Sequence, residues 1–266
     1  MGGPDAGRRQ APCDGCVGYK RRLFVQRSLG QVKSDLGRLD LLQITLVVAD
    51  LEATAAAFED ELGLRVAFRD PSVDLWGLEN IVLPMGTTFI EVLSPKRPDT
   101  PGGRHLARQG GDGGYMVILQ TRDLTPWRRQ IEETDVRIAF EAETRDAEDG
   151  QDWSGIHLHP GDTGGMMISL DRPDPPDSWA GAGPHWRDFI SQEVVTGLAG
   201  IELRSDDPDR LAHRWSEVLG RPIEHGRRIR LDQGTIGFRG SQAGEVEGLS
   251  AVELRAAERA RAGEAI

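Results

Sequence analysis

Apolar and polar residues alternate from residue 42 onward, and over 42–48 the pattern predicts a β-strand. An Ala-rich amphipathic stretch follows and predicts a helix, with Asp50 as its N-cap and Gly63 as the residue where it stops. Three short strands are predicted next, at 65–69, 80–83 and 87–93. Residues 42–93 therefore predict a βαβββ unit.

This unit recurs along the chain. A shift of 73 residues places 115–119 over the first strand, and the later strands of that copy are expected at 136–140, 155–159 and 165–170. A shift of 157 residues gives identity at six positions, at which Ile201, Leu203, Asp207, Ala212, Leu219 and Gly220 repeat Ile44, Leu46, Asp50, Ala55, Leu62 and Gly63. Residues 252–255 begin a fourth, truncated copy. The predicted class is α+β, built from tandem βαβββ modules that form an open β-barrel, followed by a partial module pair.

Proline and charge mark the expected domain boundaries. Residues 1–38 hold eight Lys or Arg against three Asp and are expected to be a disordered basic tail, in which Cys13 and Cys16 have no assigned role. Repeated prolines argue against a helix or a central strand in 172–194, which is expected to be a linker with its tryptophans clamped on a domain surface. Residues 40–171 then form the complete domain. Residues 195–266 form a truncated pair, whose open edge invites pairing with the first domain or with a second copy of the chain.

Charge and hydropathy exclude several classes of function. The net charge is −11, and the chain beyond the basic tail is acidic, so it should repel nucleic acid. No apolar run approaches the roughly 18 residues that a membrane span requires. The N-terminal segment lacks the layout of a signal peptide, so a cytoplasmic protein with no membrane partner is expected.

Four motifs resemble the vicinal oxygen chelate superfamily, which includes glyoxalase I, bleomycin-resistance proteins, extradiol dioxygenases and methylmalonyl-CoA epimerase. The motifs are Gln43 on the first strand, Asp50-Leu51 at the helix start, Leu62-Gly63-Leu64 at its end and Phe89-Ile90-Glu91-Val92 on the fourth strand. The resemblance covers 40–171 well and 195–266 weakly. It implies two modules around a cavity, with a divalent metal held by residues of the first and fourth strand of each module.

The resemblance places the four metal ligands at Gln43, Glu91, Met116 and Ser169. Glutamine and glutamate suit a divalent cation, whereas a methionine thioether is a poor ligand for a hard cation. Two of the four donors are therefore missing, and the standard site is expected to hold no metal.

A metal site elsewhere in the cavity would need His157 and His159. Residues i and i+2 of a strand point to one face, so both imidazoles are expected on the same side. There they could join Gln43 and Glu91 around zinc or iron, with manganese or nickel as further candidates. Two other interpretations stay open, namely metal-free acid–base work and hydrogen bonds to loop carbonyls at the barrel rim.

Glu91 shares a strand face with Phe89 and Leu93, where a buried carboxylate without a partner would be costly. It is therefore expected to act as a base or a ligand, or to pair with a cation such as Arg69. The predicted cavity wall is mainly apolar and suits an apolar or aromatic small molecule. Its residues are Trp76, Phe89, Met116, Ile118, Met167 and Ser169.

Two classes of function follow. The first is a lyase, isomerase or epimerase of the glyoxalase type, in which Glu91 takes a proton next to a carbonyl while a metal, His157 or His159 steadies the enolate. The second is metal-free binding or sequestration of a small molecule, as in the bleomycin-resistance members. Glu91 and the paired histidines favour the first, and Met116 with Ser169 favours the second. A homodimer is compatible with either.

Overall fold

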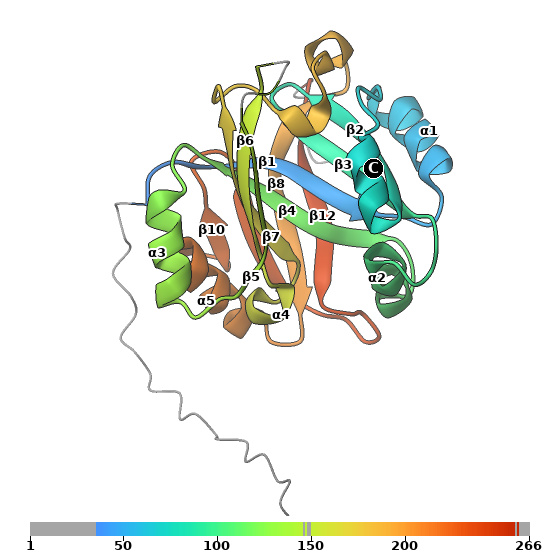
Figure 1. Ribbon diagram of the computed structural model, residues 1–266. Helices are drawn as coiled ribbons and strands as arrows, with labels where there is room; N and C mark the ends of the chain where they lie inside the picture. The colour runs from blue at the N-terminus through green and yellow to red at the C-terminus, as the bar shows by residue number, and fades with distance from the viewer. Residues whose placement is uncertain (1–35, 146, 148–149, 259, 261–266) are drawn as a thin grey trace, which may run out of the picture. The chain divides into compact units, whose positions relative to one another are not determined.

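The computed structural model describes residues 36–145, 147, 150–258 and 260, and Figure 1 shows how their elements are arranged. The tail expected over 1–38 falls outside these residues except for its last three positions, and so do Cys13 and Cys16. Leu36 is buried and lies against Gly220, so the folded domain includes residue 36.

Seven strands form one mixed sheet in the order β2-β3-β1-β4-β7-β6-β5. Strands β1 and β4 lie antiparallel at its centre, and each pairs in parallel with the last strand of its own module. The strands are β1 (Leu39–Val47), β2 (Leu78–Met85), β3 (Thr88–Pro95), β4 (Gly113–Thr121), β5 (Ile138–Thr144), β6 (Asp152–Leu158) and β7 (Met167–Asp174). The predicted tandem modules are confirmed, and they share one open sheet.

The first helix has the predicted caps. Helix α1 (Leu51–Leu62) begins after Asp50, whose carboxylate accepts a hydrogen bond from the third backbone N–H beyond it. The helix stops at Gly63, whose φ of +65° is a left-handed conformation that glycine adopts without strain.

Module one lacks one predicted strand. The segment 65–69 makes only an isolated bridge, between Phe68 and Val82, and a short 3-10 turn η1 (Pro71–Trp76) follows it. Module two has helix α3 (Thr125–Glu133) and all three later strands, with β5 in the edge position that module one leaves almost empty. A one-turn helix α4 (Pro160–Thr163) joins β6 to β7.

Helix α2 (Pro101–Gln109) links the modules and is an element that the predicted pattern lacks. The hydroxyl of Thr100 accepts a hydrogen bond from the Gly103 N–H at its start, and Gly110 ends it with a φ of +77°. A proline at the first position is favourable because its missing N–H would have no partner there.

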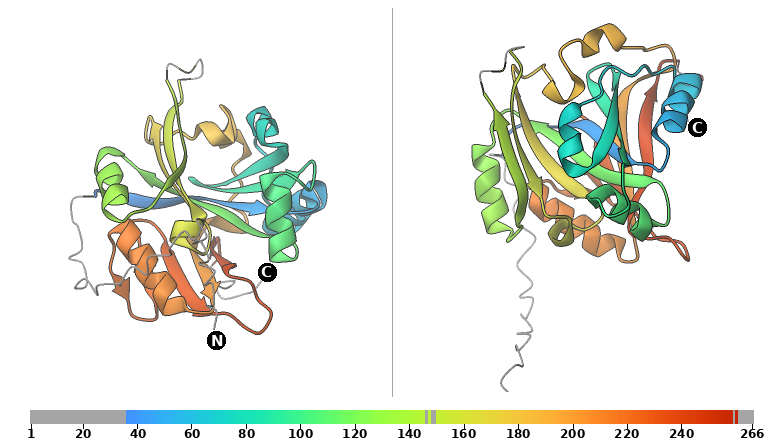
Figure 2. Two further views of the ribbon diagram at one scale, coloured as in Figure 1. Left: turned by 60° about the horizontal axis from the view of Figure 1, so that its bottom comes forward. Right: turned by 45° about the vertical axis from the view of Figure 1, so that its right-hand side comes forward.

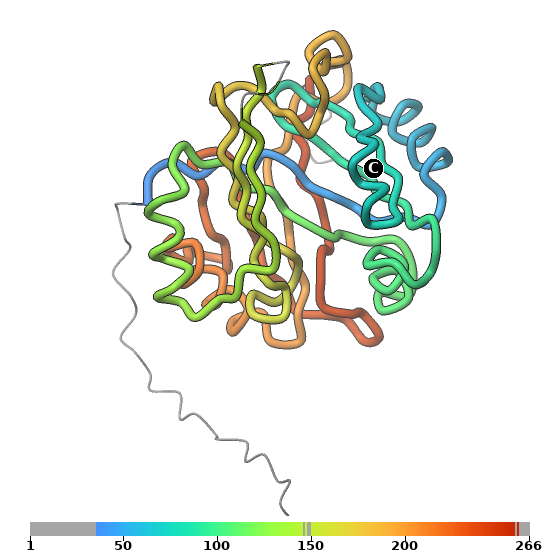
Figure 3. Tube along the Cα trace, viewed as in Figure 1, coloured from blue at the N-terminus to red at the C-terminus, as the bar shows by residue number. Residues whose placement is uncertain are grey.

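Strand β7 continues to Asp174, so the first residues of the expected linker over 172–194 belong to the sheet. Pro173 pairs with Trp153 on β6, whereas the pairing of β7 with β4 ends at Asp171. With one partner strand at this point, the missing N–H is tolerated. The chain then forms two 3-10 turns, η2 (Ala180–Ala182) and η3 (Trp186–Phe189), which contact β2 and loop over one end of the sheet (Figure 3).

The third module forms a second sheet, in the order β12-β8-β11-β10-β9. Strands β8 and β11 are parallel, as β4 and β7 are, and β12 lies antiparallel to β8, as β4 does to β1. The elements are β8 (Val195–Ser205), α5 (Pro208–Leu219), β9 (Ile223–Glu224), β10 (Arg228–Arg230), β11 (Thr235–Gly240) and β12 (Gly248–Ala256). The fourth copy therefore contributes its first strand, and the predicted dimer stays a prediction.

One large apolar core lies between the two sheets. It includes Ile44, Val92 and Leu170 of the first sheet and Ile201 and Phe238 of the second. In the left view of Figure 2 the two halves of the first sheet curve away from the second sheet, so their other face is concave. None of the helices in the described ranges is long and apolar enough to cross a membrane.

Candidate functional site

The strand registers bring most predicted site residues into two adjacent rows on the concave face. Residues directly opposite each other in neighbouring strands lie on one face of a sheet. The first row consists of Phe89, Gln43, Ile118, Ser169, His157 and Phe140. The second row consists of Glu91, Thr45, Met116 and Met167.

Glu91 is held by three neutral hydrogen-bond donors. Its Oε1 accepts a bond of 2.7 Å from Asn80 Nδ2. Its Oε2 accepts bonds of 2.9 Å from Thr45 Oγ1 and 3.0 Å from Gln43 Nε2. Burial raises the pKa of the Glu91 carboxyl above its ordinary value, and the three bonds lower it only in part.

The predicted ion pair of Glu91 with Arg69 does not form. Arg69 reaches instead to Glu52 on α1, at 2.8 Å, with both side chains exposed. Among the described residues, no Lys, Arg or His forms an ion pair with Glu91. Its carboxyl group is therefore oriented by neutral groups alone.

Glu91 lies on the concave face of the first sheet, and the part of this face around it is called the recess below. Although it lies deep in the fold, its side chain keeps partial exposure to solvent, and so do Met116, Met167 and His157 on the same face. Phe89 is fully buried beside them. This face therefore combines a carboxyl group with two thioethers and an imidazole, and a mainly apolar surface with a few polar groups is typical of small-molecule sites.

The Pro/Trp segment closes one end of this recess. The indole N–H of Trp179 donates a hydrogen bond of 2.7 Å to Gln43 Oε1. The Phe89 ring packs edge-on against Trp186, with ring centroids 5.0 Å apart, and lies 6.4 Å from the Trp179 ring. The tryptophans are thus part of the site's wall, a role that their place in a predicted linker did not suggest.

The two predicted histidines lie in different surroundings. His157 is on β6, opposite Ser169, and burial alone lowers its pKa to about 4, so its imidazole is neutral near pH 7. His159 follows the end of β6 and caps α4, where its Nδ1 accepts a hydrogen bond of 3.1 Å from Gly161 N. The catalytic role of either histidine stays a prediction, but only His157 faces the recess.

Trp76, the last predicted cavity residue, lies at the end of η1 and is 48% exposed. Its ring meets Phe140 of β5 edge to face, with centroids 5.8 Å apart. The turn η1 contacts strand β2. Strands β2 and β5 are the two edge strands of the seven-stranded sheet. This ring contact therefore spans the opening of the curved sheet.

Asp171 is a second buried carboxyl group that the sequence analysis missed. It accepts hydrogen bonds from the Ser169 hydroxyl and from the Trp153 indole, and it has no exposed surface. Burial raises its pKa to about 7. Gly155 lies opposite it, and a Cβ there would overlap the Trp153 ring and sit 3.1 Å from Asp171 Oδ2. A Ser-x-Asp spacing on a strand was the available signal, since it puts both side chains on one face.

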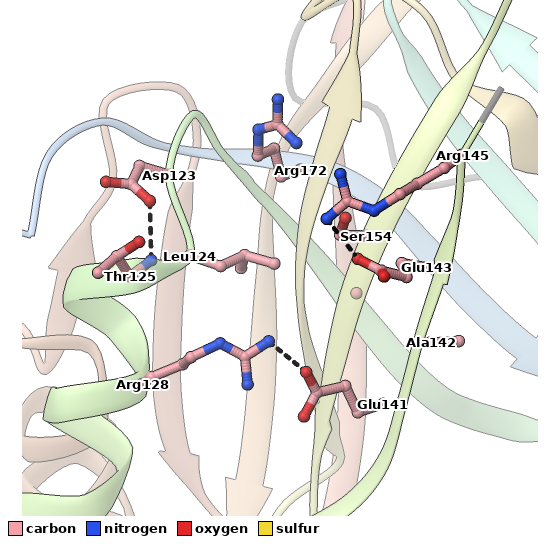
Figure 4. Close-up of a pocket in the computed structure, with 11 residues that line it drawn as sticks. Asp123, Leu124, Thr125, Arg128, Glu141, Ala142, Glu143, Arg145, Ser154 and Arg172 are labelled. Atoms are coloured by element: carbon pink, nitrogen blue, oxygen red, sulfur yellow. Dashed lines mark hydrogen bonds and ion pairs between the residues drawn. The ribbon is translucent and has the colours of Figure 1, made fainter.

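A separate polar pocket of about 500 Å³ lies between α3 and strands β5 and β6 (Figure 4). Ser154 and Arg172 lie opposite each other, one position away from the pair Gly155 and Asp171. Because neighbouring residues of a strand point to opposite faces, they line the pocket on the face away from Asp171. Four of its charged groups form the ion pairs Arg128–Glu141 and Arg145–Glu143. Asp123 accepts a hydrogen bond from Thr125 N, so the charged groups of this pocket are largely engaged with one another or with the backbone.

Comparisons with known proteins agree with this geometry. The family model described as a glyoxalase-like domain matches residues 44–219, which is most of the described chain. The chain belongs to the glyoxalase-like domain family. This family lies within the vicinal oxygen chelate superfamily, so the resemblance read from the motifs is confirmed.

Curated relatives of this glyoxalase-like protein include two epimerases. The ethylmalonyl-CoA/methylmalonyl-CoA epimerase of Cereibacter sphaeroides is 26% identical over 137 residues, which cover 52% of this chain and 98% of the relative. The mitochondrial methylmalonyl-CoA epimerase of Bos taurus is 28% identical over 138 residues, covering 52% of this chain and 75% of the relative. A solved mutant of 4-hydroxymandelate synthase from Streptomyces coelicolor has a TM-score of 0.61 at 17% identity over 82% of this chain and 71% of that one, which shows the fold alone.

The four ligand positions implied by this superfamily do not fit a hard divalent cation. Gln43 Oε1 accepts the Trp179 N–H, and the Ser169 hydroxyl donates to Asp171. Both oxygens of Glu91 accept bonds from neutral donors, and Met116 offers a thioether. Among the described residues, no group of three His, Cys, Asp or Glu side chains could hold a metal.

Proposed function

We propose that the concave recess binds a small oxygenated organic molecule and that Glu91 exchanges a proton at the carbon next to its carbonyl group. The reaction is of the epimerase or isomerase type. Proton transfer at such a carbon needs a base that reaches the substrate and a group that stabilises the enolate oxygen.

The state of Glu91 carries this proposal. Glu91 is partly exposed on the concave face, none of the described residues is its cationic partner, and burial raises the pKa of its carboxyl group. A carboxylate with a raised pKa is a stronger base than one in water. The raised pKa of Glu91 is also closer to neutral pH, where a general base is most effective. Perturbed ionisable groups in a recess are candidates for function. The epimerase names of two relatives support the same class of reaction.

The neighbouring side chains have separate roles. Gln43, Thr45 and Asn80 fix the carboxyl group of Glu91 in one orientation through their hydrogen bonds. His157 is neutral near pH 7, so one of its ring nitrogens carries a proton that it can donate to a developing oxyanion without transferring it.

Solvent deuterium exchange tests the proposal. Methylmalonyl-CoA, the compound in the relatives' names, is incubated with the protein in D₂O, and deuterium at its acidic carbon is followed by mass spectrometry. The native chain should accelerate incorporation, and Glu91→Gln should reduce the rate by about 100-fold or more. Glu79→Gln, which changes an exposed carboxyl group on β2, is the matched control and should leave the rate within about twofold.

Two results would overturn it. One is native protein that does not exceed the uncatalysed rate. The other is a Glu91→Gln variant that exchanges as fast as the native chain.

Metal-free binding without chemistry is the second candidate, and the contact between Trp179 and Gln43 favours it. That contact occupies Gln43 Oε1, and Met116 and Met167 offer only thioethers, so the recess presents few donors to a metal and much apolar surface to a ligand. Calorimetric binding of methylmalonyl-CoA by a native chain that shows no exchange would support this candidate over the first.

A further inference from the structure

The geometry points to Trp76 and Phe140 as the entrance of the recess and as the residues that select ligands carrying a flat apolar group. This inference rests on the proposed ligand site but not on proton transfer by Glu91. It concerns which molecules enter and bind, and a binding measurement tests it separately.

Phe140 connects the surface to the recess. Its ring meets Trp76 at a centroid distance of 5.8 Å and an interplanar angle of 87°. On its other side it lies 5.1 Å from the imidazole of His157, which faces the recess. Trp76 is 48% exposed and Phe140 is 39% exposed. The rings of Trp76, Phe140 and His157 therefore form a continuous row from the surface to the concave face.

A β-bulge turns Phe140 toward this path. Ile138 lies opposite Leu158, which packs in the main core, whereas Phe140 lies opposite His157. The register shifts between the two positions, so the strand presents Phe140 to the concave face. Bulges commonly re-aim a side chain next to a functional site.

The turn that carries Trp76 is tied to Glu91. Asn80 Oδ1 accepts a hydrogen bond of 2.8 Å from the backbone N–H of Asp70, the N-cap of η1. The amide of the same residue donates to Glu91. One side chain therefore fixes both the carboxyl group in the recess and the start of the turn at its entrance.

Trp76 and Phe140 are both exposed and in contact, so they form one small aromatic patch, and exposed apolar patches mark candidate ligand-binding surfaces. A flat apolar group suits this entrance because it can pack edge to face or offset against both rings, and such ring pairs contribute beyond their buried area. The ligand class that follows is a small acid or carbonyl compound with an aryl substituent.

Binding of phenylacetone and butanone, measured by calorimetry, tests the inference. Both probes are uncharged ketones, which suits a face where no described residue gives Glu91 a cationic partner, and they differ only in a phenyl or a methyl substituent. The native chain should bind phenylacetone about 10-fold more tightly than butanone. Trp76→Ala and Phe140→Ala should each reduce this preference to about threefold or less, because each removes one of the two rings.

Three matched variants sharpen the result. Trp76→Phe keeps a ring and should retain most of the preference. Leu75→Ala removes an apolar side chain that is 84% exposed on the same turn and should retain all of it. Glu91→Gln should keep the preference even if it abolishes exchange, which separates failure of this inference from failure of the proposed reaction.

The inference is overturned if the native chain binds neither probe, or binds both equally. It is also overturned if neither alanine variant changes the preference. Light scattering of a native dimer that Trp76→Ala converts to a monomer would assign these rings to a second copy of the chain and would equally contradict it.

Discussion

The two modules of the first sheet each place a carboxyl group on the concave face, and the two groups have opposite surroundings. Glu91 in module one keeps contact with solvent and is held by three neutral donors. Asp171 in module two has no exposed surface and is enclosed by Ser169, Trp153 and Gly155. The same scaffold thus holds one reachable acid and one sealed acid.

The difference shows how the repeat has diverged. In the registers, Ser169 of β7 occupies the place that corresponds to Glu91 of β3, and the acid of module two lies two residues farther along its strand. Positions on the other face of the sheet, such as Ile90 and Ile168, stay apolar because both modules bury that face in the main core. The residues that face the core are therefore apolar in both modules, while the residues on the concave face differ between them.

Asp171 in module two should contribute a stability that depends on pH. Burial raises the pKa of Asp171 to about 7 from its ordinary value of 3.8, so between these pH values the folded state holds a proton that the unfolded state has lost. Stability from this group is therefore full below about pH 4 and falls by about 1.4 kcal/mol per pH unit as pH rises to about 7. Urea unfolding of native protein and Asp171→Asn across this range should differ by up to about 4 kcal/mol in total. Parallel pH profiles would contradict the buried state of Asp171.

Truncating Asp171 to alanine should be the most damaging substitution on this face. At pH 5, where the carboxyl is protonated, Asp171→Ala leaves the Ser169 hydroxyl and the Trp153 indole without their partner in a dry site. We expect a loss of about 3 kcal/mol in the free energy of unfolding, against less than about 1 kcal/mol for Glu91→Gln, which keeps its shape and some hydrogen bonds. Equal losses would remove the distinction between the two acids.

Gly155 should tolerate no side chain. Gly155→Ala places a methyl group against the Trp153 ring and Asp171, and we expect it to cost about 2 kcal/mol. Gly113, also on this sheet, has its nearest neighbour at 3.8 Å and no positive φ. Gly113→Ala is therefore the control, with a change below about 0.5 kcal/mol. A Gly155→Ala variant as stable as the control would mean that the Trp153 ring moves freely.

Removing Arg69 should have the smallest effect. Its ion pair with Glu52 is exposed, so Arg69→Ala should change stability by less than about 0.5 kcal/mol. Because Arg69 does not touch Glu91, the exchange rate of the recess should also stay within about twofold. A large fall in that rate would restore Arg69 as the partner of Glu91.

Local patterns predict most of this fold. Capping residues and alternating strands are encoded by neighbouring positions, so Asp50, Gly63 and the six identities of the third copy locate helices and strands without any tertiary information. Helix α2 escapes this pattern because Gly102 and Gly103 make its first turn a weak helix former, and both are buried. Its Thr-Pro start and Gly110 stop were nevertheless visible signals.

The site is harder to predict, because its decisive contacts join distant residues. Gln43, Glu91 and Met116 are located by the repeat, and the registers place them in adjacent rows. The hydrogen bond of Trp179 to Gln43 spans 136 residues, and no local signal indicates that a Pro-rich segment returns to the cavity. The bulge that turns Phe140 inward also depends on pairing with β6, which strand alternation alone does not specify.

Carboxyl footprinting compares the two acids in one sample and tests this account most directly. The native protein is labelled with a carbodiimide and a small amine, and modification at Glu91 and Asp171 is measured by mass spectrometry against Glu79 as an exposed reference. We expect modification of Glu91 in the native state, reduced when a recess ligand is bound, and modification of Asp171 only after unfolding. Native protein in which Asp171 is modified as readily as Glu91, or in which Glu91 is fully protected, would contradict the distinction between a reachable and a sealed acid.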